Sequence, residues 1–280
     1  MVKEIKNISI IGTGYLGKQI IEKSLLYNYS IRAFDIDRAD LDEFTNKMKK
    51  KIKDESLKSN ISQYYTIKEA VKDADLVIEA IPEKLELKRE IFPKIDEAAP
   101  PHAIIATNSS SIPISKIEDV VKRKDKVLNI HFYDLFTLPL ADIMRGTQTN
   151  EETFEKGKRW LESIEIIPLE VKKECFGFVL NRIWRAIKKD CLKIWAGGYA
   201  DFETIDKAWA TFCQFFIKNE FGPFQWMDRI GLDVVYDIEM SYFKNSGNPD
   251  DKPPDSLKEL VDKGNKGVKT GKGFYNYKSK

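Results

Sequence analysis

The segment IGTGYLG constrains the fold of this 280-residue chain more than any other stretch. It places Gly12, Gly14 and Gly17 in a G-x-G-x-x-G pattern directly after the short apolar run ISII. Asp35 follows 18 residues beyond Gly17, where a second apolar run, SIRAF, ends. A buried strand, a glycine-rich turn, a helix and an acidic residue after the next strand are typical of a dinucleotide-binding βαβ unit. The sequence therefore predicts a nucleotide site at the end of the first strand.

Each part of this turn has its own physical task. Gly12 permits the tight turn, Gly14 lets the backbone approach a pyrophosphate, and Gly17 allows close packing of helix against strand. The helix that begins near Tyr15 and Leu16 presents free N–H groups, which bind phosphate oxygens. We therefore expect these five residues to hold the pyrophosphate of the cofactor.

Asp35 determines which dinucleotide is expected. Its carboxylate would accept hydrogen bonds from the ribose hydroxyls of the adenosine half, and its charge repels a 2′-phosphate. NAD is therefore favoured over NADP. Arg32 and Arg38 lie nearby in the sequence and weaken this preference, because a cation attracts a 2′-phosphate.

The first half of the chain alternates short apolar runs with amphipathic segments. Alternating strands and helices predict a parallel sheet that is covered by helices on both faces. Runs without strict alternation fit strands that are buried on both sides. We expect strands over residues 8–11, 30–34, 76–81, 103–107 and 127–130, and helices over residues 16–27, 40–53 and 85–97.

The pattern becomes helical after about residue 170. Four of the five tryptophans lie in this half. We therefore predict an α/β fold of two domains, a Rossmann-type parallel-sheet domain over residues 1–173 and an all-helical domain over residues 174–280. Within the second domain we expect helices over residues 179–195, 201–217 and 222–243, and a loop rich in Pro, Asn and Asp over residues 245–256.

The charge balance argues against a nucleic-acid-binding protein. The chain has 46 basic and 44 acidic residues, so no strong positive field attracts a polyanion. No apolar run approaches the length of a membrane span, and the first residues lead into a strand without room for a signal peptide. The three cysteines are an odd number without metal spacing. We therefore expect reduced thiols in a cytoplasmic protein, with no metal site and no membrane contact.

Seven blocks of sequence occur in one order: IGTGYLG, DLVIEAIPEKLELKREIF, ATNSSSIPISKI, HFYDLFTLPLADIMRG, GFVLNRI, GPFQWMDRIGLD and KTGKGFYNY. Together they resemble the 3-hydroxyacyl-CoA dehydrogenase family nearly end to end, and the chain is close in size to the short 3-hydroxybutyryl-CoA dehydrogenases. The resemblance implies a Rossmann-type domain followed by a helical domain that forms the contact of a homodimer. It also implies NAD-linked, reversible oxidation of an L-3-hydroxyacyl-CoA to the 3-ketoacyl-CoA, a reaction of fatty acid metabolism.

The block HFYDLFTLPLADIMRG contains His131, which matches the family's catalytic histidine. Removal of a hydroxyl proton needs a base within hydrogen-bond reach, and histidine suits this task near neutral pH. The carboxylate that orients the imidazole would be Asp142, at a position where the family has glutamate. Aspartate is one methylene shorter, but the interval from His131 is also one residue shorter. We expect the shorter interval to compensate; the alternative is that Asp142 misses His131.

Five further residues match family positions in or beside the active site. Ser110 is expected beside substrate and cofactor, and Asn181 beside the substrate, although each could simply cap a loop or a helix. Glu83 and Lys88 match positions beside the nicotinamide ribose, although alone they would be interpreted as solvated helix charges. Lys269 lies in a C-terminal segment that in the family closes against the first domain.

The sequence departs from the family at Asp134, where relatives have an asparagine close to the nicotinamide. A carboxylate near His131 would favour the charged imidazolium and, by its own charge, would favour NAD⁺ over NADH. It would also repel an anionic substrate. Asp134 therefore either changes the charge around His131 or marks a changed substrate.

A second departure is a deletion. Only 40 residues separate Asp35 from Asp75, fewer than is usual in the family, and the missing part belongs to a helical hairpin that helps to hold CoA. The basic segment NKMKKKIKDESLK that remains could bind CoA phosphates or be a solvated helix. Three interpretations stay open: NAD-dependent oxidation of an acyl-CoA, the same chemistry on a small free hydroxy acid, as in gulonate or carnitine dehydrogenases, or an inactive NAD-binding relative.

Overall fold

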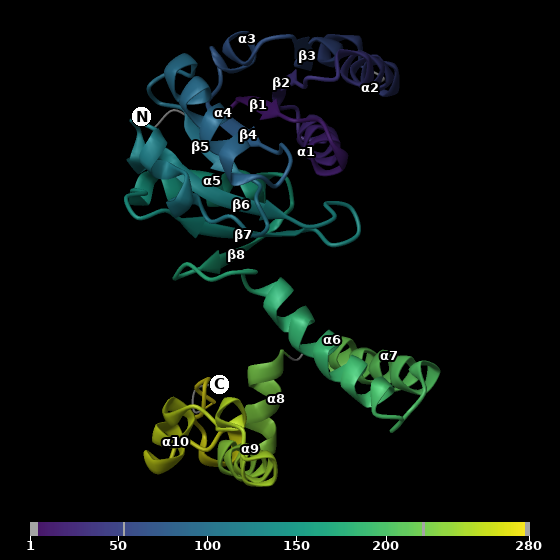
Figure 1. Cartoon of the computed structure of the whole chain (residues 1–280), viewed down its shortest axis with the longest axis vertical. Helices are drawn as coiled ribbons and strands as arrows, with labels where there is room; N and C mark the ends of the chain where they lie inside the picture. Colours follow the sequence, from purple (N-terminus) through teal and green to yellow (C-terminus); the bar gives the residue numbers. More distant parts are fainter. Residues whose placement is uncertain (1–4, 53, 220–221, 278–280) are drawn as a thin grey trace. The chain divides into compact units, whose positions relative to one another are not determined.

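The computed structural model describes residues 5–52, 54–219 and 222–277 (Figure 1). The chain divides into two compact units, Met1–Lys188 and Lys189–Lys280. The predicted domain boundary between residues 173 and 174 stays a prediction.

The first unit is built on one eight-stranded sheet with the order β3-β2-β1-β4-β5-β6-β7-β8. All neighbouring strands pair in parallel except β6 and β7, which are antiparallel. The predicted α/β fold with a mostly parallel sheet is confirmed, and the sheet extends beyond the predicted strands at both edges. The strands are β1 (Asn7–Ile11), β2 (Ser30–Phe34), β3 (Ile61–Tyr64), β4 (Leu76–Glu79), β5 (Ile104–Thr107), β6 (Val127–Phe132), β7 (Leu140–Arg145) and β8 (Ile167–Val171).

Helices cover both faces of this sheet, which is why β4 and β5 are buried at every position. One apolar cluster joins the sheet to α1 (Tyr15–Leu26), α2 (Arg38–Lys51) and α5 (Glu151–Ser163). A second cluster joins the other face to α3 (Ile67–Val71) and α4 (Leu85–Ala98). Short 3-10 helices complete the first unit: η1 (Glu55–Asn60), η2 (Ile114–Lys116), η3 (Glu118–Val120) and η4 (Lys124–Lys126).

Helix α2 shows how local sequence fixes a helix start and end. The side chain of Asp37 caps the helix by accepting a hydrogen bond from the N–H of Asp40 at 3.1 Å. Three lysines occupy the last turn, where positive charge opposes the negative end of the helix dipole. The helix was predicted over residues 40–53; it begins two residues earlier, and residue 53 lies outside the described residues.

Strand β6 divides its side chains between the core and the site. Leu128, Ile130 and Phe132 point into the cluster under α5, where Phe132 packs edge-on against the buried Trp160 with ring centroids 5.9 Å apart. Successive side chains of a strand point to opposite faces. The anchoring of Phe132 therefore sends its neighbour His131 to the other face.

The carboxyl ends of β1, β2, β4, β5 and β6 lie along one edge of the sheet. Gly12 follows β1, Asp35 follows β2, Asn108 follows β5, and His131 is the penultimate residue of β6. The chain leaves β1 toward β2 on one side, while β4 flanks β1 on the other. Ligands of doubly wound sheets bind at such a switch point, so the fold brings these residues to one candidate site.

The second unit is helical. Helix α6 (Leu180–Ala196) crosses the boundary between the units, and the remaining elements are α7 (Phe202–Asn219), α8 (Pro223–Ile230), α9 (Leu232–Ser246), η5 (Pro249–Asp251), α10 (Asp255–Asp262) and η6 (Val268–Thr270). A single helix was predicted over residues 222–243, and this is wrong. Gly231 adopts a φ of 104° between α8 and α9, a conformation that helices exclude and glycine tolerates.

The C-terminal segment of the second unit is held by a buried carboxylate. Asp228 of α8 is fully buried and accepts hydrogen bonds from the N–H groups of Phe274 and Tyr275 and from the hydroxyl of Tyr277, each at 3.0 Å. A side chain at Gly273 would collide with the same carboxylate. Gly273, the second glycine of KTGKGF, is therefore required by the close approach of the backbone to Asp228.

Candidate active site

The glycine-rich turn has the shape that a pyrophosphate requires. Gly12 has a φ of 104°, and a Cβ on it would lie 2.5 Å from the carbonyl oxygen of Ala80. A Cβ on Gly14, in contrast, would meet nothing within 4 Å. Gly14 is also the N-cap of α1 and offers no side-chain cap, so the first N–H groups of the helix face open space. The turn therefore leaves both room and donors for phosphate oxygens.

Two hollows flank this turn. We call the first the adenosine pocket; it has a volume of about 450 Å³. We call the second the reaction pocket; it has a volume of about 360 Å³. Both are lined by Gly14, Ala80 and Ile81, so they meet at the glycine turn. Two pockets joined at a phosphate-binding turn fit the two nucleoside halves of NAD.

The adenosine pocket is apolar with one carboxylate. Asp35 lies among side chains that include Phe34, Ile36 and Leu87. The carboxylate of Asp35 accepts hydrogen bonds from the N–H of Thr13 at 2.6 Å and from the N–H of Asp37 at 2.9 Å. These bonds hold it at the pocket, where it can meet ribose hydroxyls.

The two arginines near Asp35 are engaged elsewhere. Arg32 lies over the ring of Tyr64 at 4.2 Å and donates to the carbonyl oxygen of Ala70 at 2.8 Å. Arg38 lies over the ring of Tyr65 at 5.2 Å. Arg32 is therefore already bonded, whereas Arg38 is exposed and the weakening of the NAD preference expected from it stays a prediction.

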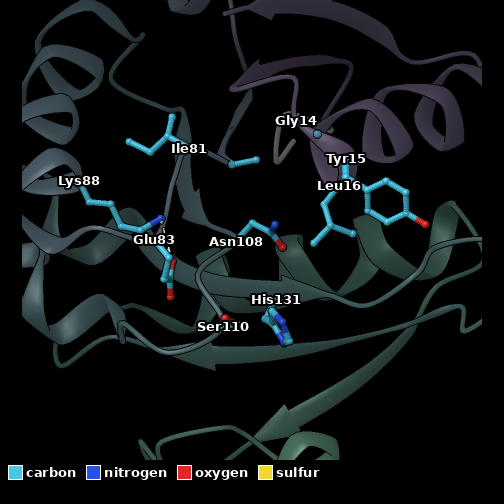
Figure 2. Close-up of a pocket in the computed structure, with 11 residues that line it drawn as sticks. Gly14, Tyr15, Leu16, Ile81, Glu83, Lys88, Asn108, Ser110 and His131 are labelled. Atoms are coloured by element: carbon cyan, nitrogen blue, oxygen red, sulfur yellow. Dashed lines mark ion pairs between the residues drawn. The ribbon is translucent and has the colours of Figure 1, made fainter.

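The reaction pocket holds most of the predicted site residues. Figure 2 shows His131 and Ser110 facing this pocket, with Lys88 paired to Glu83. Of the predicted residues, those that line it are Gly14, Tyr15, Leu16, Gly17, Glu83, Lys88, Ser110 and His131. Asn108 lines it as well, and its side-chain oxygen accepts the N–H of Phe132 at 2.9 Å.

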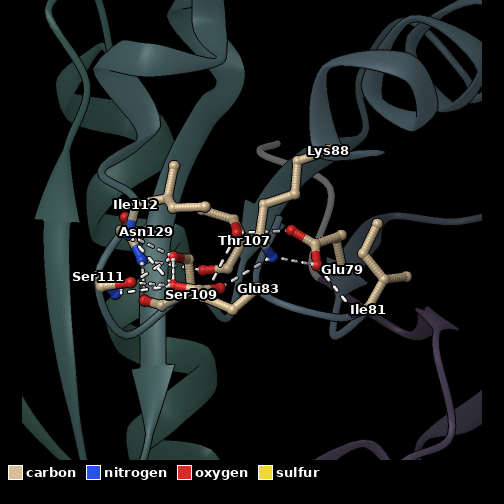
Figure 3. A network of polar contacts seen from close by, with 9 residues as sticks. All are labelled: Glu79, Ile81, Glu83, Lys88, Thr107, Ser109, Ser111, Ile112 and Asn129. Carbon is tan, nitrogen blue, oxygen red and sulfur yellow. Dashed lines mark hydrogen bonds and ion pairs between the residues drawn. The ribbon is translucent and has the colours of Figure 1, made fainter. Parts of the chain in front are cut away.

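Lys88 is buried between two carboxylates (Figure 3). Its ammonium lies 2.7 Å from Glu79 and 3.4 Å from Glu83, and its side chain is 1% exposed. The interpretation of Lys88 as a solvated helix charge is therefore wrong. Glu79 also accepts from the hydroxyl of Thr107 at 2.6 Å and from the N–H of Ile81 at 2.8 Å. Glu79 was absent from the predicted site, although a charged residue inside the apolar strand LVIE was a visible signal.

Glu83 is fixed by the loop that follows β5. Its Oε1 accepts the hydroxyls of Ser109 at 2.5 Å and of Ser111 at 2.7 Å, together with the N–H of Ser111 at 2.9 Å (Figure 3). Partial burial raises the pKa of Glu83, but the hydrogen bonds from Ser109 and Ser111 and the charge of Lys88 lower it to about 2. Glu83 therefore carries a full negative charge beside the pocket.

His131 and Asp142 face each other across the antiparallel pair of β6 and β7. Nδ1 of His131 lies 3.4 Å from Oδ2 of Asp142. Asp142 has no exposed surface, and the histidine residue is 5% exposed. The structure therefore places the predicted pair within contact, and the alternative that Asp142 misses His131 is not supported. Because Nδ1 faces the carboxylate, Nε2 is the nitrogen left for the reaction pocket.

Three neighbours of this pair did not enter the predicted site. Tyr133 donates its hydroxyl to Oδ2 of Asp142 at 2.6 Å, and its ring lies edge-on to His131 at 4.7 Å. The N–H of Val179 lies 3.3 Å from the other carboxylate oxygen. Phe178 stacks on the imidazole, with ring centroids 5.2 Å apart and an angle of 15° between the planes. Only Tyr133 gave a signal in the sequence, as a hydroxyl-bearing neighbour of His131.

Of the two predicted substrate-binding residues, Ser110 lies at the reaction pocket and Asn181 lies beside Tyr133. Ser110 is exposed at the reaction pocket, and within the described ranges its hydroxyl takes part in no hydrogen bond. Asn181 is the second residue of α6, and its backbone N–H faces the hydroxyl of Tyr133. Their predicted roles stay predictions.

Asp134 lies at the start of the loop between β6 and β7. It accepts the hydroxyl of Tyr15 at 2.7 Å, the side-chain amide of Gln19 at 3.0 Å and the N–H of Thr137 at 2.9 Å. Hydrogen bonds from Gln19, Tyr15 and Thr137 lower the pKa of Asp134 below its usual value. These partners lie on α1 and in its own loop, so the observed role of the carboxylate is to join these two elements.

Lys269 belongs to the second unit. Its ammonium lies 2.5 Å from Asp233 at the start of α9. The hydrogen bond from Lys269 lowers the pKa of Asp233. The predicted cofactor contact of Lys269 stays a prediction.

Among the residues that the structure describes, no helix has the length and apolar character that a membrane crossing needs.

Neutralising Asp35 should weaken the preference for NAD. The Asp35→Asn variant keeps an acceptor for Thr13 but loses the charge that repels a 2′-phosphate, so the ratio of NADPH to NADH dissociation constants should fall about tenfold. Fluorescence titration with both reduced cofactors measures this ratio. Asp42→Asn, on a half-buried residue of α2 that bonds Tyr65, is the matched control. An unchanged ratio in Asp35→Asn would contradict the assignment.

Glu83→Gln should destabilise the protein in a pH-dependent way. The folded pKa of Glu83 is about 2, below the ordinary value of 4.5, so its carboxylate stabilises the fold fully above pH 4.5 and loses this contribution as the pH falls toward 2. Urea unfolding at several pH values should therefore show that the difference in free energy of unfolding between parent and variant becomes smaller below pH 4.5. Glu43→Gln, on an exposed position of α2, should show no such trend. A difference in free energy of unfolding that does not change with pH would contradict the prediction.

The family of the chain follows from comparison with known proteins. Residues 7–175 match the family model of the 3-hydroxyacyl-CoA dehydrogenase NAD binding domain, and residues 177–277 match the model of the C-terminal domain of the same family. A probable 3-hydroxybutyryl-CoA dehydrogenase of Bacillus subtilis (strain 168) is 30% identical over 290 residues, covering 99% of each chain.

Two solved structures extend this similarity. A diketoreductase associated with catalysis of dicarbonyl compounds is 32% identical with a TM-score of 0.69, covering 98% of this chain and 100% of that one. A 3-hydroxyacyl-CoA dehydrogenase from Archaeoglobus fulgidus is 26% identical with a TM-score of 0.82, covering 98% of this chain and 93% of that one. The cofactor of the matched N-terminal domain is NAD. The chain belongs to the 3-hydroxyacyl-CoA dehydrogenase family.

Proposed function

We propose that the protein catalyses the reversible, NAD-dependent oxidation of an L-3-hydroxyacyl-CoA to the 3-ketoacyl-CoA, with His131 as general base. The observation that carries this proposal is that His131 lines the pocket that begins at the glycine turn and contacts Asp142 through Nδ1. Membership of the family and the similarity to a probable 3-hydroxybutyryl-CoA dehydrogenase support a short acyl chain.

His131 removes the proton of the substrate hydroxyl. Nε2 accepts this proton while the carbon that carries the hydroxyl loses a hydride, so the alcohol becomes a ketone. When bound, NAD⁺ supplies the hydride acceptor. The imidazolium that forms is stabilised by the buried charge of Asp142, because a hydrogen bond between charged groups is stronger than one between neutral groups. In the reverse direction the imidazolium returns the proton to the ketone oxygen.

The remaining polar residues position substrate and cofactor. In this proposal the hydroxyl of Ser110 binds the reacting oxygen of the substrate, and the amide of Asn181 binds the same oxygen or the thioester carbonyl. Glu83 and Lys88 offer an acceptor and a donor to the nicotinamide ribose. In this proposal Lys88 needs Glu79, because its buried ammonium would otherwise lack a second counter-charge.

The lysines of α2 support a CoA ester as substrate. Lys47, Lys50 and Lys51 line an open hollow of about 570 Å³ together with Asn46 and Glu43. Phosphates would gain a modest, salt-sensitive attraction there. The basic segment predicted over residues 46–58 thus ends α2, begins η1 and includes the connection between them, in which residue 53 lies outside the described residues.

A second candidate is the same chemistry on a small hydroxy acid or ketone without CoA. The short interval between β2 and β4 removes part of the CoA-binding hairpin of the family, and the diketoreductase associated with dicarbonyl compounds is 32% identical. The third interpretation, an inactive NAD-binding relative, rests on Asp134 and on the short interval between His131 and Asp142. The 3.4 Å distance between Nδ1 of His131 and Oδ2 of Asp142 argues against the second of these grounds.

The protein should consume NADH with acetoacetyl-CoA. The measurement is the fall in NADH absorbance, with acetoacetate and a simple diketone as parallel substrates. His131→Asn should lower kcat about 10²–10⁴-fold, the usual contribution of a general acid–base group, while the dissociation constant for NADH stays within about twofold. His102→Asn is the matched control, because His102 lies outside the reaction pocket.

The outcomes separate the candidates. Turnover of acetoacetate or the diketone without turnover of acetoacetyl-CoA would replace the first candidate by the second. Binding of NADH without turnover of any substrate would refute both. Full activity of His131→Asn would refute the assignment of the base.

We also propose a cytoplasmic homodimer. In the second unit, large apolar side chains of α7 lie open, with Phe212 53% and Ile217 77% exposed, and no residue of α7 is buried. Exposed apolar patches of this kind mark contact surfaces. Light scattering should therefore give a mass of twice 32.4 kDa. A mass of 32.4 kDa at the concentration used for assays would contradict the dimer. The cytoplasmic location and the place in fatty acid metabolism stay predictions.

A further inference from the structure

Three groups converge on the buried carboxylate of Asp142. Oδ2 accepts the hydroxyl of Tyr133 at 2.6 Å and lies 3.4 Å from Nδ1 of His131. Oδ1 lies 3.3 Å from the N–H of Val179. Because Asp142 has no exposed surface, each of these contacts determines how its charge is distributed. The arrangement is thus a shared carboxylate rather than an isolated pair.

The two contacts at Oδ2 are unequal. A distance of 2.6 Å is typical of a strong hydrogen bond from a hydroxyl to a carboxylate. A distance of 3.4 Å between Nδ1 and Oδ2 corresponds to a long and weak hydrogen bond. Burial, followed by the hydrogen bond to Asp142, raises the pKa of Tyr133 well above its usual value. The phenol therefore stays protonated and keeps donating throughout the working range of the enzyme.

We propose that Tyr133 is a positioning residue that competes with His131 for Oδ2 of Asp142 and thereby weakens the base. This inference rests on the proposed function, in which His131 is that base. The hydroxyl of Tyr133 takes up part of the negative charge that would otherwise stabilise the imidazolium. Asp142 then holds the imidazole in place without making it strongly basic.

The surroundings of His131 leave Asp142 as its main electrostatic partner. Tyr133, the residue after β6, and Phe178, after β8, present rings to the imidazole. In the reaction pocket, the charged residues Lys88 and Glu83 pair with each other at 3.4 Å. Within the described part of the chain, Asp142 of β7 is the one charged group in hydrogen-bond contact with His131.

Removal of the Tyr133 hydroxyl should therefore raise the basicity of His131. In Tyr133→Phe the ring and its edge contact remain, but Oδ2 is offered to Nδ1 alone. The acidic limb of the pH profile of kcat/KM for oxidation should move up by about one pH unit, the effect of one hydrogen bond to a charged group. In the reducing direction, which needs the imidazolium, the alkaline limb should move up by the same amount.

A second tyrosine provides the matched control. Tyr65 also donates its hydroxyl to an aspartate, Asp42 of α2 at 2.8 Å, but it lies outside the reaction pocket. Tyr65→Phe should leave both limbs of the profile in place. In an Asp142→Asn background, Tyr133→Phe should produce no shift, because no carboxylate charge remains to be shared.

A direct titration tests the inference without catalysis. The chain has only two histidines, so an NMR titration of the imidazole rings yields two sets of signals, and His102→Asn assigns them. The midpoint of His131 should rise by about one pH unit in Tyr133→Phe. If that variant does not fold, 3-fluorotyrosine at position 133 keeps the ring and strengthens the hydroxyl as a donor, so the midpoint should fall.

The results are decisive in each case. An unshifted midpoint in Tyr133→Phe, or in the fluorotyrosine protein, would overturn the inference. A uniform loss of kcat at every pH with an unshifted profile would also overturn it, because Tyr133 would then serve only to hold the strand. Full activity of His131→Asn would refute the proposed function, while the NMR titration would still report whether Tyr133 and His131 share Asp142.

Discussion

The antiparallel pairing of β6 with β7 is the constraint on which the reaction pocket depends. Its register sets His131 directly opposite Asp142, so both side chains leave the same face of the sheet. A slip of one residue would turn Asp142 toward the other face, where Phe132 and Trp160 pack under α5. Cross-strand neighbours have Cβ atoms about 5 Å apart. An aspartate therefore spans the gap, and the missing methylene of the family's glutamate is not needed.

The nucleotide half of the site could be predicted from the sequence because its determinants are local. The glycine turn, the start of α1 and Asp35 all lie within one βαβ unit, and each residue type has a conformational or chemical reason at its position. The His131–Asp142 contact is different, since it depends on the register of a strand that local patterns did not reveal. Leu140–Arg145 is a buried strand that contains a charged aspartate, and apolar periodicity alone does not identify such a segment.

Burial of charge explains why the role of α4 was also difficult to predict. Lys88 and Glu83 belong to a segment rich in charged residues, which normally indicates a solvated helix. The decisive partner is Glu79, a carboxylate at the end of a fully buried strand. A buried ammonium persists only with such partners. Thr107, Ser109 and Ser111 then satisfy the remaining carboxylate oxygens, so the loop after β5 is ordered by the same network.

The carboxylates of Asp142 and Asp134 lie in different environments, so solvent screens their charges to different extents. Asp142 is excluded from water, so its charge acts on His131 with little screening. Asp134 lies in the β6–β7 loop and accepts hydrogen bonds from Tyr15, Gln19 and its own loop. A carboxylate only accepts hydrogen bonds, whereas the asparagine of the family also donates. The carboxylate of Asp134 therefore anchors the β6–β7 loop to α1 by accepting hydrogen bonds from Tyr15 and Gln19.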